Sequence, residues 1–210
     1  HLHRIAGLSR RFLYLNDDVF FGAPAERGFF EHSDGSIRPL FQRERVHADR
    51  TTGSIHDRAY AHSQQACGKA WRPPRIRYLP AHAPQLYDRE IIEEIERAIP
   101  DRFESTSTHR FRAADDLVLR IVHSRQVLAA SSAKEEPKVL EDSTKEYCFL
   151  RIRSSFWDGA RRLIRIARMR PRFFCINDDV DDAIGSRILM RLLPMFLWAM
   201  FPRRSELELR

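Results

Sequence analysis

Two short polar clusters, one near each end of the chain, have the residue types and spacing needed to hold a metal ion. They share the sequence Asn-Asp-Asp and consist of Asn16, Asp17 and Asp18 and of Asn177, Asp178 and Asp179. Hard divalent cations such as Mg²⁺ and Mn²⁺ prefer oxygen ligands of this kind, and they help to neutralise phosphate charge. Because a short apolar run precedes each cluster, we expect two strands to carry both clusters to a single acidic cleft.

His82 is a candidate functional histidine because of its place on a stiffened loop. It lies between Pro80 and Pro84, and these prolines stiffen the loop that presents its imidazole. The position of the ring is therefore well defined, and the loop has little conformational freedom left to lose. The alternative is a histidine that only caps the next helix.

Arg110 and Arg112 are candidates for binding a diphosphate. If residues 103–112 form an extended segment with Phe111 pointing inward, both guanidinium groups lie on the opposite face. Two such groups can clamp a diphosphate through bidentate hydrogen bonds. A basic strand that only faces solvent is the alternative interpretation.

The remaining histidines and the cysteines do not have the spacing of a zinc site. His47, His56 and His62 lack the i, i+4 spacing that places two imidazoles on one helix face, so we expect surface or hydrogen-bonding histidines. The three cysteines are far apart and form no Cys-x-x-Cys pair. Buried thiols in a reducing compartment are the simplest prediction.

Composition narrows the class of protein. With 210 residues, 43% of them hydrophobic, the chain can bury one substantial core or form two joined lobes. The net charge of +7 favours anionic partners such as nucleotides, phosphosugars or anionic lipid. Basic residues alternate with acidic ones and form no sustained basic tract, which argues against nucleic acid. The absence of Walker, Gly-x-Gly-x-x-Gly and Gly-x-Ser-x-Gly motifs disfavours P-loop kinases, dinucleotide enzymes and α/β hydrolases.

The order of apolar patterns predicts the α/β class, with a mixed sheet, flanking helices and ligands beyond the carboxyl ends of strands. Helices are expected at 54–70, 87–99, 113–130 and 156–169, and strands at 76–79, at 147–152 and from 173. Asp34-Gly35 predicts a hairpin between 28–32 and 37–41, with Pro39 placing the second arm at a sheet edge. Residues 131–146 are expected to form a mobile excursion.

The most apolar stretch, 188–201, is interrupted by Arg191 and Pro194. It falls short of the roughly 20 residues that a membrane-spanning helix needs. We expect a packed terminal helix, and peripheral attachment to a membrane surface is the alternative. We also expect a location in the cytoplasm, at the inner face of the cell membrane if the chain attaches there.

Four stretches in order resemble the Stealth family of sugar-1-phosphate transferases. They are His1–Ile5 with Phe12–Gly22, Ala81–Pro84 through Thr106–Arg112, Cys175–Asp182, and Phe201–Glu208. The resemblance divides the chain into a second conserved region at 1–42, a third at 76–130, a variable excursion at 131–146, and a fourth region with its terminal helix at 171–208. It implies a Rossmann-like or glycosyltransferase-A-like core. Since the chain begins at His1 without the family's first region, we expect 1–210 to be part of a longer catalytic domain.

The resemblance implies transfer of a hexose-1-phosphate or N-acetylhexosamine-1-phosphate from a UDP-sugar to a sugar hydroxyl. The product is a phosphodiester of a capsule or exopolysaccharide, and the partners are the nucleotide-sugar donor and a saccharide acceptor. A catalytically incomplete remnant that still binds nucleotide sugar is the competing interpretation.

By the same resemblance, the site residues receive three kinds of role. Those expected in catalysis are Asp17, Asp18, His82 and Arg112. Histidine titrates near neutral pH, so His82 is expected to serve as a general base or as a phosphate contact. Those expected to bind substrate are His3, Arg4, Asn16, His109, Arg110 and Asn177. Those expected to bind Mg²⁺ or Mn²⁺ are Asp18, Asp178 and Asp179.

Overall fold

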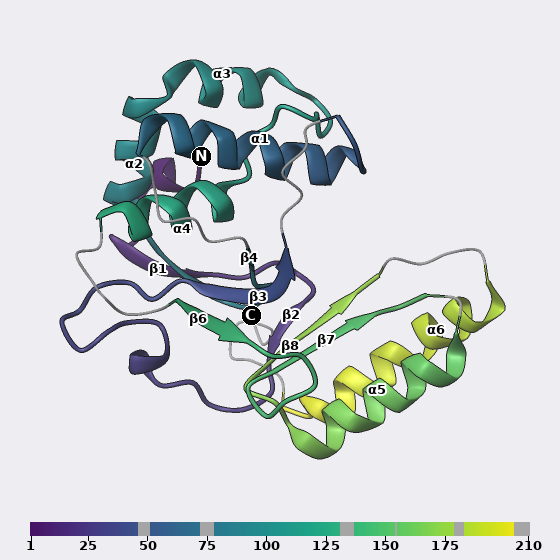
Figure 1. The fold of residues 1–210 in the computed structure, drawn as a ribbon. Coiled ribbons are helices and arrows are strands. Elements are labelled where there is room, and N and C mark those ends of the chain that lie inside the picture. The colour runs from purple at the N-terminus through teal and green to yellow at the C-terminus, as the bar shows by residue number, and fades with distance from the viewer. Residues whose placement is uncertain (46–50, 72–77, 131–136, 154, 179–182, 204–210) are drawn as a thin grey trace. The chain divides into compact units, whose positions relative to one another are not determined.

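The expected α/β class, with mixed sheets and flanking helices, is confirmed in a computed structural model (Figure 1). The structure describes residues 1–45, 51–71, 78–130, 137–153, 155–178 and 183–203. The chain divides into two compact units, each built from two separate stretches. The first unit comprises 1–14 and 26–140, and the second comprises 15–25 and 141–210.

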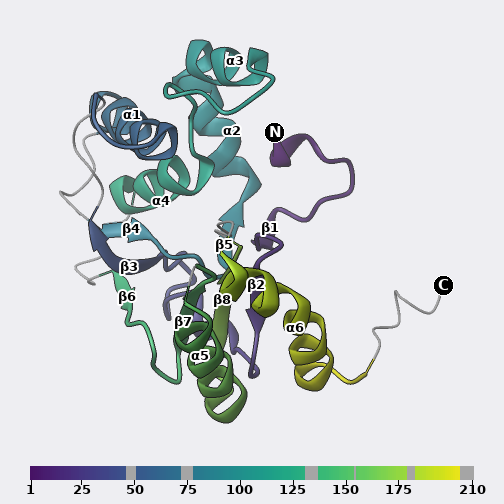
Figure 2. The same cartoon turned by 90° about the vertical axis from the view of Figure 1, so that its right-hand side faces the viewer.

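The first unit contains two small sheets and a group of helices that gather on one side of them (Figures 1 and 2). Its strands are β1 (Arg11–Tyr14), β3 (Leu40–Arg45), β4 (Tyr78–Pro80), β5 (Gln85–Asp88) and β6 (Lys138–Leu140). Its helices are α1 (Ile55–Ala70), α2 (Arg89–Ala98), α3 (Pro100–Thr108) and α4 (Leu119–Ala130), with short 3-10 helices at Leu2–Arg4 and Arg27–Phe29. β1 pairs with β5 in antiparallel fashion, while β3 is antiparallel to β4 and parallel to β6.

Local signals explain where the helices of the first unit begin. Ser54 and Asp57 form a reciprocal capping box at the start of α1, which satisfies backbone N–H groups that the first helical turn leaves unpaired. The Asp88 carboxylate caps α2 by accepting from the Glu90 backbone N–H at 2.9 Å. Pro100 ends α2, as expected, and also starts α3, because proline is well suited to the first position of a helix.

A buried polar pair fixes β5 to α4. The backbone N–H of Asp88 donates to His123 Nε2 at 3.1 Å, and both residues are buried. The contact requires a neutral imidazole, since only the neutral form has a nitrogen lone pair that can accept. Burial lowers the pKa of His123 to about 3 and so keeps the ring in that form.

Within the described residues, the second unit consists of one sheet covered by two helices. Its strands are β2 (Val19–Phe21), β7 (Tyr147–Arg151) and β8 (Phe173–Asn177), and its helices are α5 (Phe156–Met169) and α6 (Ile184–Met200). β8 lies in the middle, parallel to β7 and antiparallel to β2. The β7–α5–β8 segment is therefore a parallel β-α-β unit, the building block of Rossmann-like folds.

Several predicted elements of the chain are confirmed. The helix at 156–169 has the predicted bounds, α1 begins one residue after its predicted start, and β7 and β8 lie where strands were expected. The hairpin turn is present, with Gly35 at φ +80° and a bridge between Glu31 and Ile37.

Other predictions about elements are wrong. Residues 103–112 are not extended, because α3 occupies Pro100–Thr108, and Phe111 points outward with 78% of its surface exposed. Pro39 does not mark an edge, since it precedes β3, the central strand of its sheet. The helices predicted at 87–99 and 113–130 are present, but they start later than predicted, at Arg89 and Leu119. Part of the 131–146 excursion forms β6, and 131–136 lie outside the described residues.

Candidate functional site

Strand pairing in the second unit brings the two Asn-Asp-Asp clusters together. β2 starts directly after the first cluster and pairs with β8, so that Val19 lies opposite Cys175. Asp18 Oδ2 then accepts a hydrogen bond from Asn177 Nδ2 at 3.2 Å and another from the Cys175 thiol at 3.2 Å. The backbone N–H of Ile176 also donates to the Asp18 carbonyl oxygen at 2.8 Å. Residues that are 159 positions apart thus share one site.

The other oxygen of the Asp18 carboxylate is a candidate metal ligand. Its Oδ1 is buried and has no hydrogen-bond partner among the described residues. A buried carboxylate oxygen without a donor is costly unless a cation or water satisfies it. Asp18 and the amide oxygen of Asn177 are hard donors of the kind that Mg²⁺ and Mn²⁺ prefer, so the residues present fit such an ion.

The other members of the acidic clusters lie around this pair. Asp17 is exposed in the turn before β2, and Asn16 closes that turn because its carbonyl oxygen accepts from the Val19 N–H at 3.1 Å. Asp178 is exposed after the end of β8. Asp179 lies outside the described residues, so its predicted role as a metal ligand stays a prediction.

A cluster of basic side chains in the first unit joins the predicted residues His82 and Arg112. Arg112 Nη1 donates to His56 Nδ1 at 2.8 Å, and the His56 ring lies 4.2 Å from the ring of Tyr60. The Arg120 guanidinium lies 5.1 Å from the same tyrosine ring, and its Nη2 is 3.1 Å from His82 Nε2. We call His56, His82, Arg112 and Arg120, arranged around Tyr60, the basic cluster.

Two helices and two loops supply the residues of the basic cluster, with Arg112 on the loop after α3. His56 and Tyr60 are one turn apart on α1, Arg120 is in the first turn of α4, and His82 follows β4. α1 packs against α4, and α4 packs against β4, which brings these residues together. The backbone N–H of His82 also donates to the side chain of Gln42 on β3, at 3.3 Å.

Electrostatics keep His56 neutral. Burial and the positive charges of Arg112 and Arg120 lower its pKa to about 4. An arginine has only donors, so a neutral imidazole can hold Arg112 through its Nδ1 lone pair. The cluster is therefore a concentration of positive charge in which at least one histidine acts as an acceptor for arginine.

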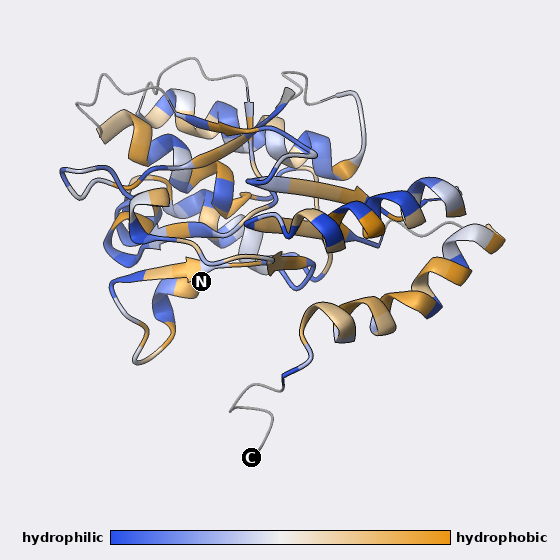
Figure 3. Cartoon of the chain, turned by 90° about the horizontal axis from the view of Figure 1, so that it is seen from below, coloured by the Kyte–Doolittle hydropathy of each residue, from blue (hydrophilic) through white to orange (hydrophobic). Residues whose placement is uncertain are grey.

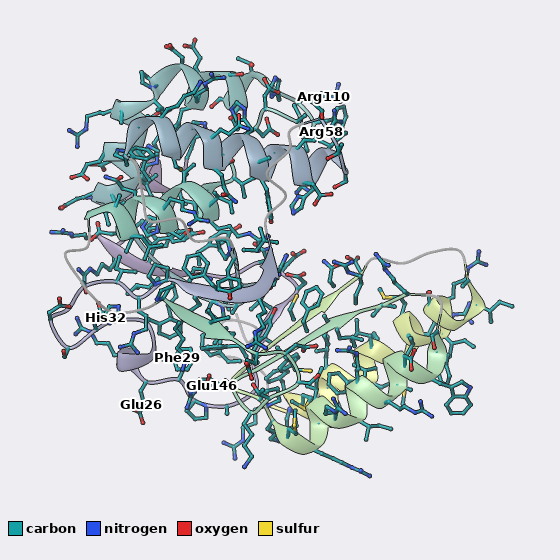
Figure 4. All side chains as sticks on the ribbon, viewed as in Figure 1. Glu26, Phe29, His32, Arg58, Arg110 and Glu146 are labelled. Carbon is teal, nitrogen blue, oxygen red and sulfur yellow. The ribbon has the colours of Figure 1, made fainter. Side chains whose placement is uncertain are left out.

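His109 and Arg110 lie beside the cluster on the loop after α3. His109 Nδ1 is 2.7 Å from Asp116 Oδ1, and this hydrogen bond raises the pKa of the histidine. Asp116 Oδ2 accepts from the Ala113 N–H at 2.8 Å, so the carboxylate fixes the loop that carries Arg112. The Arg110 guanidinium lies 5.4 Å from the Phe111 ring. Figure 4 shows Arg110 and Arg58 projecting at the end of the helical layer where α1 begins.

His3 and Arg4, predicted to bind substrate, pair with a helix of the first unit. His3 Nε2 and Arg4 Nη2 contact the two carboxylate oxygens of Glu96 on α2, at 2.8 and 2.5 Å. His3 is buried, whereas the Arg4 side chain is 60% exposed. These contacts dock the first residues of the chain onto α2.

Sequence reasoning missed His56, Tyr60 and Arg120. His56 was predicted to be a surface or hydrogen-bonding histidine, and its hydrogen bond to Arg112 confirms the second of these. The available signal was the His-x-x-x-Tyr spacing, which places both rings on one face of α1. Nothing in the sequence around Arg120 distinguishes it from the other arginines. Of the other two histidines considered for zinc, His62 is buried on α1 and His47 lies outside the described residues.

Two family models match this chain, and each matches one separate stretch of it. Residues 81–119 match conserved region 3 of the Stealth proteins, a stretch that includes His82, His109 and Arg112. Residues 164–210 match conserved region 4 of the same proteins, which includes β8 and Asn177.

Curated relatives carry consistent names. An exopolysaccharide phosphotransferase of Streptomyces coelicolor is 31% identical, and the alignment covers 99% of this chain and 34% of that protein. An exopolysaccharide phosphotransferase of Mycobacterium tuberculosis is 28% identical over 96% of this chain and 37% of its own length. A capsular polysaccharide phosphotransferase of Neisseria meningitidis serogroup A is 24% identical over 99% and 38%. The chain thus spans about a third of the length of these relatives.

Proposed function

Because this chain belongs to the Stealth proteins, we propose that it serves sugar-1-phosphate transfer in the synthesis of a capsule or exopolysaccharide. The observation that carries the proposal is the basic cluster, since the match to conserved region 3 includes both His82 and Arg112. Its positive charge suits a diphosphate, and it contains a candidate general base.

The proposed donor is a UDP-sugar and the acceptor is a sugar hydroxyl. The acceptor oxygen attacks the phosphorus that carries the sugar, and the bond from that phosphorus to the bridging oxygen breaks. UMP leaves with the bonding electron pair, and the acceptor proton passes to a base. The product is a sugar phosphodiester. In such a reaction the protein mainly positions the groups and stabilises the developing negative charge.

We assign these tasks to members of the basic cluster. Arg112 and Arg120 bind the transferring phosphate, because guanidinium groups form strong bidentate hydrogen bonds to phosphate oxygens. His82 takes the acceptor proton at Nε2 once Arg120 turns from this nitrogen to the phosphate. The 3.1 Å contact to Arg120 supports this role, because it requires His82 to be neutral at Nε2.

The acidic residues of the second unit are assigned to a divalent cation. Asp18 and Asn177 would hold Mg²⁺ or Mn²⁺, with Asp178 as an additional ligand, and the ion would neutralise diphosphate charge. The support is the buried Asp18 Oδ1 without a partner among the described residues. Mn²⁺ binding to Asp18→Asn, followed by electron paramagnetic resonance, tests this assignment without relying on activity. Unchanged Mn²⁺ affinity would remove Asp18 from the ligand set.

The test of the reaction is a comparison of variants supplied with UDP-sugar, a saccharide acceptor and Mg²⁺. We expect the chain to release UMP, and we expect His82→Gln and Arg112→Gln each to lower the rate by a factor of about 100 or more. Phe111→Leu changes an exposed side chain beside Arg112 and serves as the matched control. Rates close to wild type in both variants would overturn the assignments.

Calorimetry with UDP-sugar and Mg²⁺ separates the proposal from the competing interpretation of a binding remnant. Binding together with UMP release supports the enzyme, whereas binding without turnover supports the remnant. Absence of both binding and turnover contradicts the proposed function of this chain.

A further inference from the structure

The second unit has a layer of two helices, α5 and α6, whose inner face is buried against the sheet and whose outer face is exposed. α5 and α6 pack against each other and against one face of the β2–β8–β7 sheet. The inner face is apolar and well buried, with Leu163 and Ile166 from α5 and Leu189 and Met200 from α6. At Gly159 a Cβ would overlap the Leu189 side chain, so the two helices are in close contact. The core of the unit is therefore complete without the outer face.

The outer face of this layer is unusually apolar. On α6 the exposed apolar residues recur every three or four positions and form one stripe: Ile184, Ile188, Leu192, Met195 and Trp198. On α5, Trp157 and Ile164 are 70% and 51% exposed. Figure 3 shows α6 as a helix that is hydrophobic along most of its length. Large apolar side chains that remain exposed along neighbouring helices in this way usually mark an interaction site. We call these seven residues the outer stripe.

The charged residues within α5 and α6 are almost all positive. α6 carries Arg187 and Arg191 and no acidic residue, and both arginines are exposed. On the outer side of α5, Arg161, Arg165 and Arg168 are exposed, and Asp158 is the one acidic residue of that helix. A protein partner would need acidic residues placed to match five scattered arginines. The surface of an anionic lipid bilayer supplies negative charge everywhere, together with an apolar interior.

We propose that the outer face of α5 and α6 docks onto an anionic membrane surface, with both helices lying in the plane of the bilayer. The outer stripe enters the headgroup region, tryptophans sit at the interface, and the arginines contact lipid phosphates. No helix among the described residues is long and apolar enough to cross a bilayer, so the proposed attachment is peripheral. This inference concerns a partner and is independent of the proposed reaction.

The first test is co-sedimentation of the 210-residue chain with vesicles of phosphatidylcholine, with or without 30% phosphatidylglycerol as a chosen test composition. We expect binding to the anionic vesicles that weakens as salt is raised. A blue shift of tryptophan fluorescence should accompany it, because Trp157 and Trp198 enter a less polar environment. Failure to bind anionic vesicles, or equal binding to both kinds, would overturn the proposal.

Matched variants locate the surface. Trp198→Glu should weaken vesicle binding by about tenfold or more, because it places a negative charge in the outer stripe. Phe111→Glu is the control, since Phe111 is 78% exposed on the first unit and Trp198 is 74% exposed. Equal effects of the two substitutions would contradict the proposal.

Charge reversal and oligomeric state complete the test. Arg187→Glu with Arg191→Glu should remove the preference for anionic vesicles while circular dichroism remains unchanged. Sedimentation velocity without lipid tests the alternative that a second copy of the chain covers the outer face. If the chain is a dimer and Trp198→Glu makes it a monomer, the outer face is a protein interface and the membrane proposal is wrong.

Discussion

At the scale of single residues, the informative groups are those whose hydrogen bonds fix a protonation state. Arg112 donates to a neutral His56, and the Asp88 N–H donates to a neutral His123. In both cases the pKa of the histidine is low because burial disfavours the charged ring. Arg112, which its sequence context singled out for phosphate binding, is thus held in place by a histidine that was not predicted to belong to the site.

His56 is expected to act as a positioning residue for Arg112. His56→Phe removes the acceptor and should weaken binding of the UDP-sugar about tenfold, because a hydrogen bond to a charged group is lost. His56→Asn should restore most of the affinity, since the Asn oxygen can replace Nδ1 as acceptor. Calorimetric titration measures both. Equal affinities for His56→Phe and the wild type would show that Arg112 is positioned without this contact.

At the scale of elements, the sequence predicts best where local pattern and burial agree. The helix at 156–169 has its apolar residues at helical spacing and a polar cap at Ser155, and its predicted bounds are confirmed. The prediction of an extended segment at 103–112 is wrong because its hydroxyl residues, although poor helix formers, are part of α3. In α3, Thr106 and Ser107 instead donate to the carbonyl oxygens four residues earlier. Whether a segment rich in hydroxyl residues forms a strand or a helix depends on its contacts with residues that are distant in sequence.

Two helical glycines should respond in opposite ways to substitution by alanine, because only Gly159 lies in the contact between α5 and α6. Gly159→Ala should lower the free energy of unfolding by about 1–3 kcal/mol, because its Cβ would overlap Leu189 on α6. Gly68→Ala on α1 meets no atom within 4 Å and should raise it by about 0.5–1 kcal/mol through better helix propensity. Urea unfolding of both variants measures the difference. Stabilisation by both substitutions would show that α6 gives way easily.

At the scale of the whole molecule, the chain interleaves two units that sequence reasoning did not separate. The first Asn-Asp-Asp cluster belongs to the second unit although it follows β1 of the first, because β2 pairs with β8. The prediction that the two clusters share a cleft rested on their repeated sequence, and the hydrogen bond between Asn177 and Asp18 brings them together. The order of the strands was not predictable, since it depends on pairings across more than 150 residues.

The buried histidine predicts how stability depends on pH. His123 has an ordinary pKa of 6.5 when unfolded and about 3 when folded, so below pH 6.5 the unfolded chain binds a proton that the folded chain does not. Stability from this group is complete above pH 6.5 and is lost as pH falls toward 3, by about 1.4 kcal/mol per pH unit. In His123→Gln this part of the slope should disappear. Identical slopes in urea unfolding at pH 4 to 7 would contradict the assignment.

The central claim is that the group transferred is the sugar together with its phosphate. The most direct measurement uses UDP-sugar labelled with ³²P in the phosphate that carries the sugar, supplied with acceptor and Mg²⁺. We predict that the label appears in the saccharide phosphodiester and that the released nucleotide is unlabelled UMP. Release of labelled UDP, with an unlabelled saccharide product, would instead identify transfer of the sugar alone and contradict the proposed function.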